Sequence, residues 1–214
     1  MSQLHYITRP STLKENAPLL IMCHGYGSDE NDLFSFASEL PEELFIISVR
    51  APHPMQPYGN AWYAINFDAE RGKWNDVPQA KESIGLISDF IDYACKTYPV
   101  DTKNVTLLGF SQGTILSYAV SLTYPEKVKN VIALSGYISE DMLPEVIDKD
   151  RISHLNFFCS HGSVDQVIPV DWAQKAPVYL TTLGIDNVFT EYPVGHGVAP
   201  QNFHDLKAWL ENHI

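Results

Sequence analysis

Short apolar runs alternate with segments of helical periodicity along most of the chain. The runs cover residues 19–24, 44–49, 104–110, 130–135, 156–160 and 188–192. Runs that are apolar at nearly every position are typical of strands covered on both faces, as in a parallel sheet between helices. The alternation therefore predicts an α/β fold with a mostly parallel central sheet and helices on both faces. Residues 3–7 are expected to add an antiparallel edge strand.

Three segments carry clear helix signals. The first begins near Asp76 and Pro78 and presents one apolar stripe, because apolar residues recur there at steps of three or four. This stripe comprises Ile84, Ile87, Ile91, Ala94 and Tyr98. A second helix is expected over residues 170–183, ended by Gly184 and kinked at Pro177. The last helix is expected to open near Pro200.

Length and charge narrow the class of protein. The 214 residues are predicted to form a single domain, residues 1–214, because domains commonly hold about 100–200 residues. The 14 basic and 26 acidic residues give a net charge of −12. Such a charge repels nucleic acids and anionic lipid surfaces. We therefore expect no nucleic-acid partner and no stable membrane association.

Targeting signals and cysteines point to a compartment. The longest apolar runs fall far short of the roughly 18 residues that a membrane span requires, and residues 1–10 lack the apolar core of a secretion signal. Cys23, Cys95 and Cys159 cannot all pair, and their spacing does not fit a zinc site. These features predict a cytoplasmic protein in a reducing environment.

A G-x-S-x-G motif occupies residues 109–113, directly after the predicted strand 104–110 and before a helical pattern. In a nucleophile elbow, the serine sits in a strained strand-to-helix turn, where side chains two positions to either side would collide. The motif therefore predicts Ser111 as a nucleophile at the top of the sheet. The alternative is a glycine-rich turn with an incidental serine.

A serine hydroxyl is a poor nucleophile unless a histidine, itself oriented by a carboxylate, can remove its proton. Asp165 follows the predicted strand 156–160, and His196 follows the strand 188–192 between two glycines. Functional groups gather at the carboxyl ends of parallel strands, and the order Ser, Asp, His is the one used by α/β-hydrolase folds. The sequence therefore predicts Ser111, Asp165 and His196 as a catalytic triad.

Attack by serine on a carbonyl creates an oxyanion that requires prepositioned N–H donors. One donor is expected to be the backbone N–H of Gln112, at the start of the helix that the elbow opens. The second is expected to be the backbone N–H of Tyr26, in the His-Gly-Tyr-Gly turn after the strand 19–24. The alternative for this turn is a simple strand exit.

An irregular segment, residues 51–75, is rich in proline and aromatic residues. Its side chains have two interpretations, as walls of an acyl-binding site or as aromatics that pack the loop onto the domain. The candidates for substrate binding are Met55, Tyr58, Trp62, Tyr63 and Trp74. No segment between the strands 130–135 and 156–160 is long enough for a lid domain, so we expect a shallow apolar groove for short to medium acyl chains.

With these motifs, the chain resembles the phospholipase/carboxylesterase family of α/β-hydrolases, whose small bacterial carboxylesterases are related to acyl-protein thioesterases. The matching segments are residues 24–27 with 29–33, 61–63, 109–113, 161–162 with 165–169, and 195–197. The resemblance implies an α/β-hydrolase fold without a large lid domain, the triad and oxyanion amides named above, and hydrolysis without a metal or cofactor. Two positions depart from the family pattern: Ala64 follows the Trp-Tyr motif, and Tyr26 stands where many relatives have leucine.

Together, these features predict a carboxylesterase-type serine hydrolase that forms an acyl-enzyme. Its expected partner is a small-molecule ester or thioester, and the resemblance is compatible with a homodimer. At the level of the family, the alternatives are a lysophospholipase and an acyl-protein thioesterase. The non-enzymatic alternative is a ligand-binding receptor on a hydrolase scaffold, against which the intact triad argues.

Overall fold

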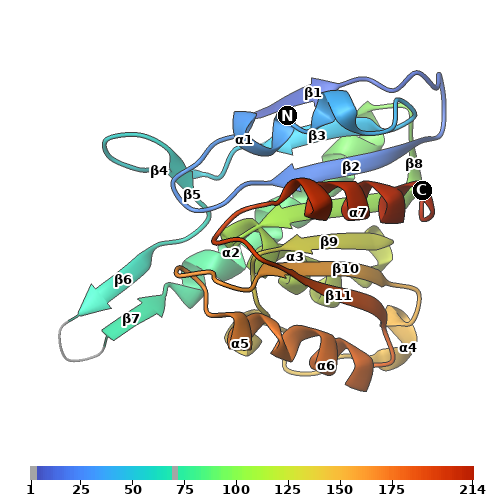
Figure 1. Ribbon diagram of the computed structural model, residues 1–214. Helices are drawn as coiled ribbons and strands as arrows, with labels where there is room; N and C mark the ends of the chain where they lie inside the picture. The colour runs from blue at the N-terminus through green and yellow to red at the C-terminus, as the bar shows by residue number, and fades with distance from the viewer. Residues whose placement is uncertain (1–3, 69–71) are drawn as a thin grey trace.

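The computed structural model describes residues 4–68 and 72–214 and confirms the α/β architecture (Figure 1). Its main sheet has the order β1-β3-β2-β8-β9-β10-β11. Strand β1 is antiparallel to β3, and the other neighbouring strands are parallel. The strands are β1 (Tyr6–Arg9), β2 (Ala17–Cys23), β3 (Phe45–Val49), β8 (Val100–Phe110), β9 (Asn130–Leu134), β10 (Asn156–Gly162) and β11 (Asp186–Tyr192).

The six predicted parallel strands are all present, and their ends differ from the predicted ones by a few residues. The largest difference is at β8, which begins at Val100 because its first residues pair with the start of β2 across an irregular register. The predicted edge strand is present as an antiparallel partner of β3, but it is shifted toward Arg9. Residue 3 of that prediction lies outside the described residues.

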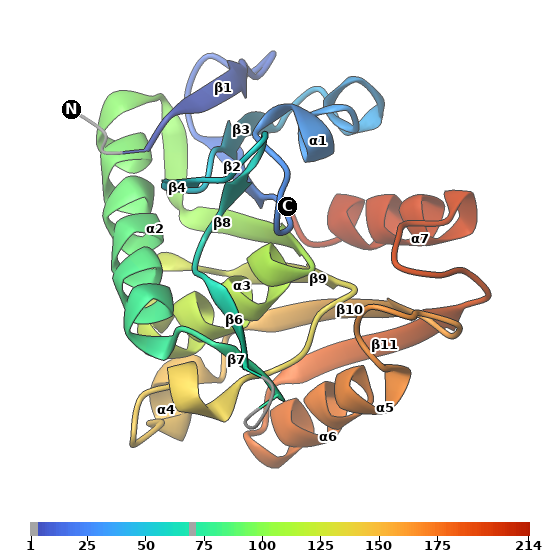
Figure 2. The same ribbon diagram turned by 90° about the vertical axis from the view of Figure 1, so that its left-hand side faces the viewer.

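Helices cover both faces of the sheet (Figure 2). They are α1 (Asn31–Phe34), α2 (Val77–Thr97), α3 (Gln112–Thr123), α4 (Lys149–Ile152), α5 (Val170–Ala173), α6 (Lys175–Thr182) and α7 (Pro200–Glu211). Short 3-10 turns lie at η1 (Ala37–Glu39), η2 (Pro125–Lys127) and η3 (Glu140–Met142). Apolar residues of α2, α3 and α6 form one core, and those of α1 and α7 form a second core on the opposite face.

Local sequence signals account for the helix ends. Asp76 caps α2 by accepting a hydrogen bond from the backbone N–H of Gln79. The predicted helix over residues 170–183 is divided into α5 and α6 at Gln174. Pro177 explains the division, because it lacks the N–H that would bond the carbonyl of Ala173, four residues earlier.

Residues 51–75 do not form the wholly irregular loop that the sequence predicts. They contain two short antiparallel pairs, which are β4 (His53–Pro54) with β5 (Asn60–Ala61) and β6 (Ile65–Asp68) with β7 (Gly72–Asn75). Strands of two to four residues carry too little alternation to be recognised from sequence. Both pairs project beyond the carboxyl ends of the parallel strands (Figure 1). Residues 69–71 of this segment lie outside the described residues.

Candidate active site

Ser111 lies between the end of β8 and the start of α3, with a positive φ of 54° and a ψ of −114°. Its backbone N–H donates to the carbonyl of Leu134, which holds the turn against β9. A Cβ at Gly109 would lie 2.5 Å from the carbonyl oxygen of Gly113, and a Cβ at Gly113 would lie 1.9 Å from the carbonyl oxygen of Cys23. Glycine is therefore required on both sides of the serine, as a nucleophile elbow demands.

The structure brings Ser111, His196 and Asp165 into one hydrogen-bonded chain. His196 Nε2 lies 2.9 Å from Ser111 Oγ, and His196 Nδ1 lies 2.7 Å from Asp165 Oδ2. Because the carboxylate can only accept, Nδ1 carries the proton and Nε2 is left to accept from the serine hydroxyl. The imidazole also packs against the ring of Phe110, with 5.0 Å between ring centroids.

Two loops position the histidine and the aspartate. The loop after β10 donates two hydrogen bonds to the end of β11 and the loop that follows it, from Ser163 N–H to the carbonyl of Tyr192 and from Val164 N–H to that of Val194. A Cβ at Gly162 would lie 2.1 Å from the carbonyl oxygen of Gly195. This close approach of two backbones explains why glycine ends β10.

The Asp165 carboxylate is buried but well provided with donors. Oδ1 accepts from the backbone N–H groups of Val167 at 2.7 Å and Ile168 at 3.0 Å, and Oδ2 accepts from His196. Burial alone would raise the pKa of Asp165, but the hydrogen bonds from His196, Ile168 and Val167 together outweigh it and hold the pKa below the usual value. Asp165 therefore stays ionised beside the imidazole.

The two predicted oxyanion donors lie in segments that are next to the serine. Gln112 N–H lies in the first turn of α3, where the helix provides no acceptor. The His-Gly-Tyr-Gly turn approaches closely, because a Cβ at Gly25 would lie 3.3 Å from the Cβ of Ser111. Within residues 4–68 and 72–214, no hydrogen-bond acceptor contacts the N–H of Tyr26. Both amides are therefore able to receive a hydrogen-bond acceptor of a substrate.

The side chain of Gln112 has a role that the sequence analysis missed. Its Oε1 accepts from the N–H of Trp62, and its Nε2 donates to the carbonyl of Tyr63, both at 2.8 Å. Trp62 Nε1 in turn donates to the carbonyl of His24 at 2.9 Å. This buried network connects the aromatic segment to the two segments that carry the proposed oxyanion donors. The sequence does contain a signal for this role, since a polar side chain stands at a position that must be buried beneath the elbow.

His24 has a fixed tautomer in the same network. Its Nε2 accepts from the N–H of Ala51, so Nδ1 carries the proton that bonds the carbonyl of Gly25. Burial lowers the pKa of His24 below its usual value, which keeps the ring neutral. The His-Gly turn is therefore shaped by a buried imidazole as well as by its glycines.

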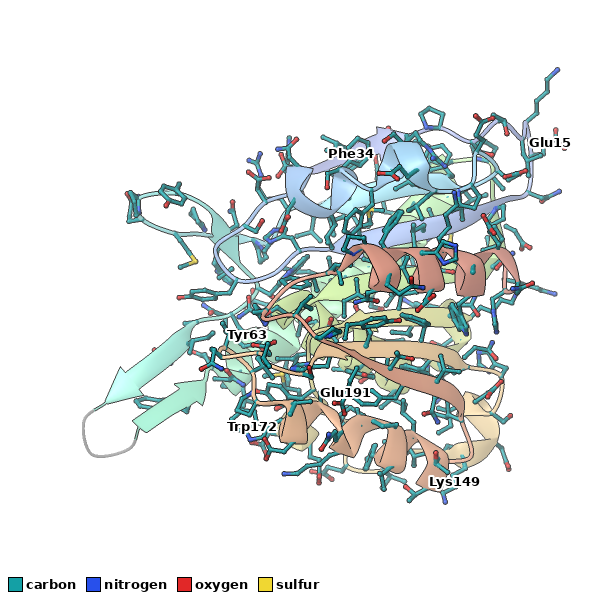
Figure 3. All side chains as sticks on the ribbon, viewed as in Figure 1. Glu15, Phe34, Tyr63, Lys149, Trp172 and Glu191 are labelled. Carbon is teal, nitrogen blue, oxygen red and sulfur yellow. The ribbon has the colours of Figure 1, made fainter. Side chains whose placement is uncertain are left out.

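The five candidate substrate residues lie in different environments. Trp62 and Tyr63 are fully buried in the core, so for these two the structure shows the packed arrangement. In Figure 3, Tyr63 lies where the chain runs toward the β6–β7 pair. Tyr58 is 79% exposed, Trp74 is 40% exposed, and Met55 is half-buried. Only the last three have side-chain surface that a ligand could contact.

A groove of about 840 Å³ lies between η3 and the α5–α6 pair, and sequence reasoning did not identify it. Its aromatic walls include Tyr137 and Trp172, whose rings meet edge to face with centroids 5.2 Å apart. Tyr137 follows Gly136, where a Cβ would lie 3.1 Å from the carbonyl oxygen of Ser111. The groove therefore begins one residue along the chain from a glycine that lies close to the serine backbone.

Within the part of the chain that the structure describes, no helix has the length and hydrophobicity needed to span a bilayer.

Comparisons with known proteins agree with this architecture. Acyl-protein thioesterase 1 of Debaryomyces hansenii is 26% identical over 240 residues, covering 99% of this chain and 98% of that protein. A protein named "Probable carboxylesterase" from Oryza sativa subsp. japonica is 28% identical over 122 residues, covering 54% of this chain and 44% of that protein. The crystal structure of the Bacillus cereus carboxylesterase superposes with a TM-score of 0.82 at 18% identity, over 99% of this chain and 95% of that one.

A family model decides the assignment, because it matches residues 7–214 and its description is Phospholipase/Carboxylesterase. The two relatives described above are named for the hydrolysis of esters and thioesters. The chain is therefore a hydrolase that belongs to the phospholipase/carboxylesterase family of α/β-hydrolases.

Proposed function

We propose that this hydrolase cleaves carboxylic esters and thioesters of short to medium acyl chains through a Ser111–His196–Asp165 triad. The observation that carries the proposal is the unbroken chain of hydrogen bonds from Ser111 Oγ to Asp165 Oδ2, with distances of 2.9 Å and 2.7 Å. The strained backbone of Ser111 supports it, because such strain is concentrated at functional sites.

In the proposed mechanism, His196 Nε2 removes the hydroxyl proton as Ser111 Oγ attacks the substrate carbonyl. The imidazolium that forms is stabilised by ionised Asp165. His196 then gives the proton to the departing alcohol or thiol, and the acyl group remains on the serine. Water enters and attacks the acyl carbon while His196 removes its proton. The bond to Ser111 Oγ then breaks, His196 returns the proton to that oxygen, and the carboxylic acid is released.

The tetrahedral intermediates place a negative charge on the former carbonyl oxygen. We assign the N–H groups of Gln112 and Tyr26 as its donors, since both are free to bond, Gln112 follows Ser111 and Tyr26 follows Gly25, which lies close to the serine. Loss of one such donor commonly lowers kcat by about 10²–10³-fold. The positive end of α3 adds to this stabilisation.

The chain surrounding the site supports a preference for short to medium acyl chains. In the described residues, the connection from β9 to β10 holds only the 3-10 turn η3 and the four-residue helix α4. These elements are too small to cover a long acyl chain.

The test is a panel of esters and thioesters with acyl chains of about two to sixteen carbons, hydrolysed by the wild type and Ser111→Ala. We expect the variant to fold and to lose activity by at least about 10⁴-fold. Full activity of Ser111→Ala would refute the triad, and a strong preference for the longest chains would refute the chain-length assignment.

A fluorophosphonate probe tests for a reactive serine whatever the natural substrate is. We expect it to label Ser111 in the wild type and not in Ser111→Ala. A wild-type protein that stays unlabelled, with no turnover of the panel, would favour a receptor on a hydrolase scaffold.

A further inference from the structure

A second histidine, His161, contacts the proposed triad aspartate. It is the next-to-last residue of β10, and its side chain is fully buried. His161 Nε2 lies 2.9 Å from the carbonyl oxygen of Ile168 and 3.3 Å from Asp165 Oδ2. This is the same carboxylate oxygen that accepts from His196 Nδ1. The proposed mechanism gives His161 no role in moving protons.

The surroundings of His161 fix where its proton lies. Nε2 faces a carbonyl oxygen and an ionised carboxylate, neither of which can donate, so Nε2 must carry the proton. His161 Nδ1 is buried and has no hydrogen-bond partner among the described residues. The register partner of His161 on β11 is Glu191, labelled in Figure 3, whose Oε1 accepts instead from Gln174 Nε2.

The contact with Ile168 closes the turn that carries the aspartate. Ile168 N–H donates to Asp165 Oδ1, while its carbonyl accepts from His161 Nε2. The Ile168 residue is therefore held on one side by the carboxylate and on the other by the imidazole. Rotation of the carboxylate would break its hydrogen bond with the N–H of Ile168.

We propose that His161 is a positioning residue for Asp165. Its Nε2–H, anchored on the carbonyl of Ile168, lies against Oδ2 and holds the carboxylate in the orientation that bonds His196 Nδ1. It also places a positive edge beside a buried negative charge, which favours the ionised form. This inference rests on the proposed function, because it acts through the Asp165–His196 pair.

Two amide variants provide a matched test. The Nε2 of a glutamine can reach the place of the imidazole Nε2, whereas the Nδ2 of an asparagine takes the place of Nδ1. We expect His161→Gln to keep kcat within about threefold of the wild type and His161→Asn to lower it by about 10–100-fold, with little change in KM. Equal kcat values for the two variants would overturn the proposal.

A double-mutant cycle separates positioning from a general structural effect. If His161 acts through the carboxylate, His161→Asn should lower kcat in the wild type but have no further effect in an Asp165→Ala background. Full additivity of the two losses would overturn the proposal. Fluorophosphonate labelling of the wild type is run in parallel, so that failure of the triad itself is recognised separately.

A spectroscopic measurement on the wild type does not depend on how the variants fold. Nitrogen chemical shifts of ¹⁵N-histidine-labelled protein report which ring nitrogen carries the proton. We expect His161 as the Nε2–H tautomer, with Nδ1 unprotonated. A proton on Nδ1 alone would leave the lone pair of Nε2 facing the carbonyl oxygen of Ile168 and Asp165 Oδ2. That result would overturn the proposal.

Discussion

Replacement of Gly113 by alanine tests how the elbow is joined to the sheet. The added Cβ would lie 1.9 Å from the carbonyl oxygen of Cys23 and 2.8 Å from that of His24, where ordinary contact begins near 3.4 Å. Both obstacles are backbone atoms, so no side-chain rotation relieves them. The start of α3 and the end of β2 would have to separate by about 1.5 Å.

Such overpacking commonly costs about 1–3 kcal/mol, and we expect Gly113→Ala to reach or exceed the upper end, because the obstacle is backbone. That is a large part of the roughly 5–15 kcal/mol that stabilises a typical domain. The same displacement would move the N–H of Tyr26 away from that of Gln112. Loss of one oxyanion donor would lower kcat by about 10²-fold or more.

Urea denaturation followed by circular dichroism gives the free energy of unfolding, and hydrolysis of a p-nitrophenyl ester gives kcat. Gly85→Ala is the matched control, because Gly85 lies inside α2 and a Cβ there would meet nothing within 4 Å. We expect this control to raise stability by about 0.5–1 kcal/mol. If the free energy of unfolding of Gly113→Ala were within about 0.5 kcal/mol of the wild-type value, the steric argument would be wrong.

Three further outcomes are expected. Gln112→Leu should lower the free energy of unfolding by about 2–6 kcal/mol in urea titrations, because two buried backbone groups lose their partners; a change below about 1 kcal/mol would contradict this. Stability should fall as pH drops from the unfolded-state pKa of about 3.9 through the lowered pKa of folded Asp165, and less steeply in Asp165→Asn, when denaturation midpoints are compared between about pH 5 and pH 2. The pKa values of Cys23 and Cys159 are raised by burial to about 12, so at about pH 8 Ellman's reagent should react with them only after unfolding.

The sequence predicts the framework of this site because its strongest signals are local. A G-x-S-x-G motif between an apolar run and a helical pattern locates the elbow, and parallel strands bring their carboxyl ends to one edge. These rules place Asp165 and His196 after neighbouring strands, β10 and β11, which the structure pairs in register from Asn156 to Gly162. That pairing brings the loops that carry Asp165 and His196 side by side.

The contacts that pack the site could not be predicted in the same way. Whether Trp62 lines a pocket or fills the core depends on partners far along the chain, such as the carbonyl of His24 and the side chain of Gln112. No periodicity within residues 51–75 encodes those contacts. The same holds for His161, whose apolar surroundings mark a buried strand but do not reveal that its ring faces Asp165.

The spacing of the proposed oxyanion donors is set by the pairing of two strands. Tyr26 follows the end of β2 and Gln112 follows the end of β8, and in the register of these strands Cys23 lies opposite Gly109. A register shift by one residue would exchange the side chains of β2 between the two cores, so the packing of both cores fixes the pairing. The donors are therefore held in place before any substrate arrives. Because folding has already oriented these N–H groups, they need not reorient during the reaction. Amides that are oriented in advance stabilise a transition state most effectively.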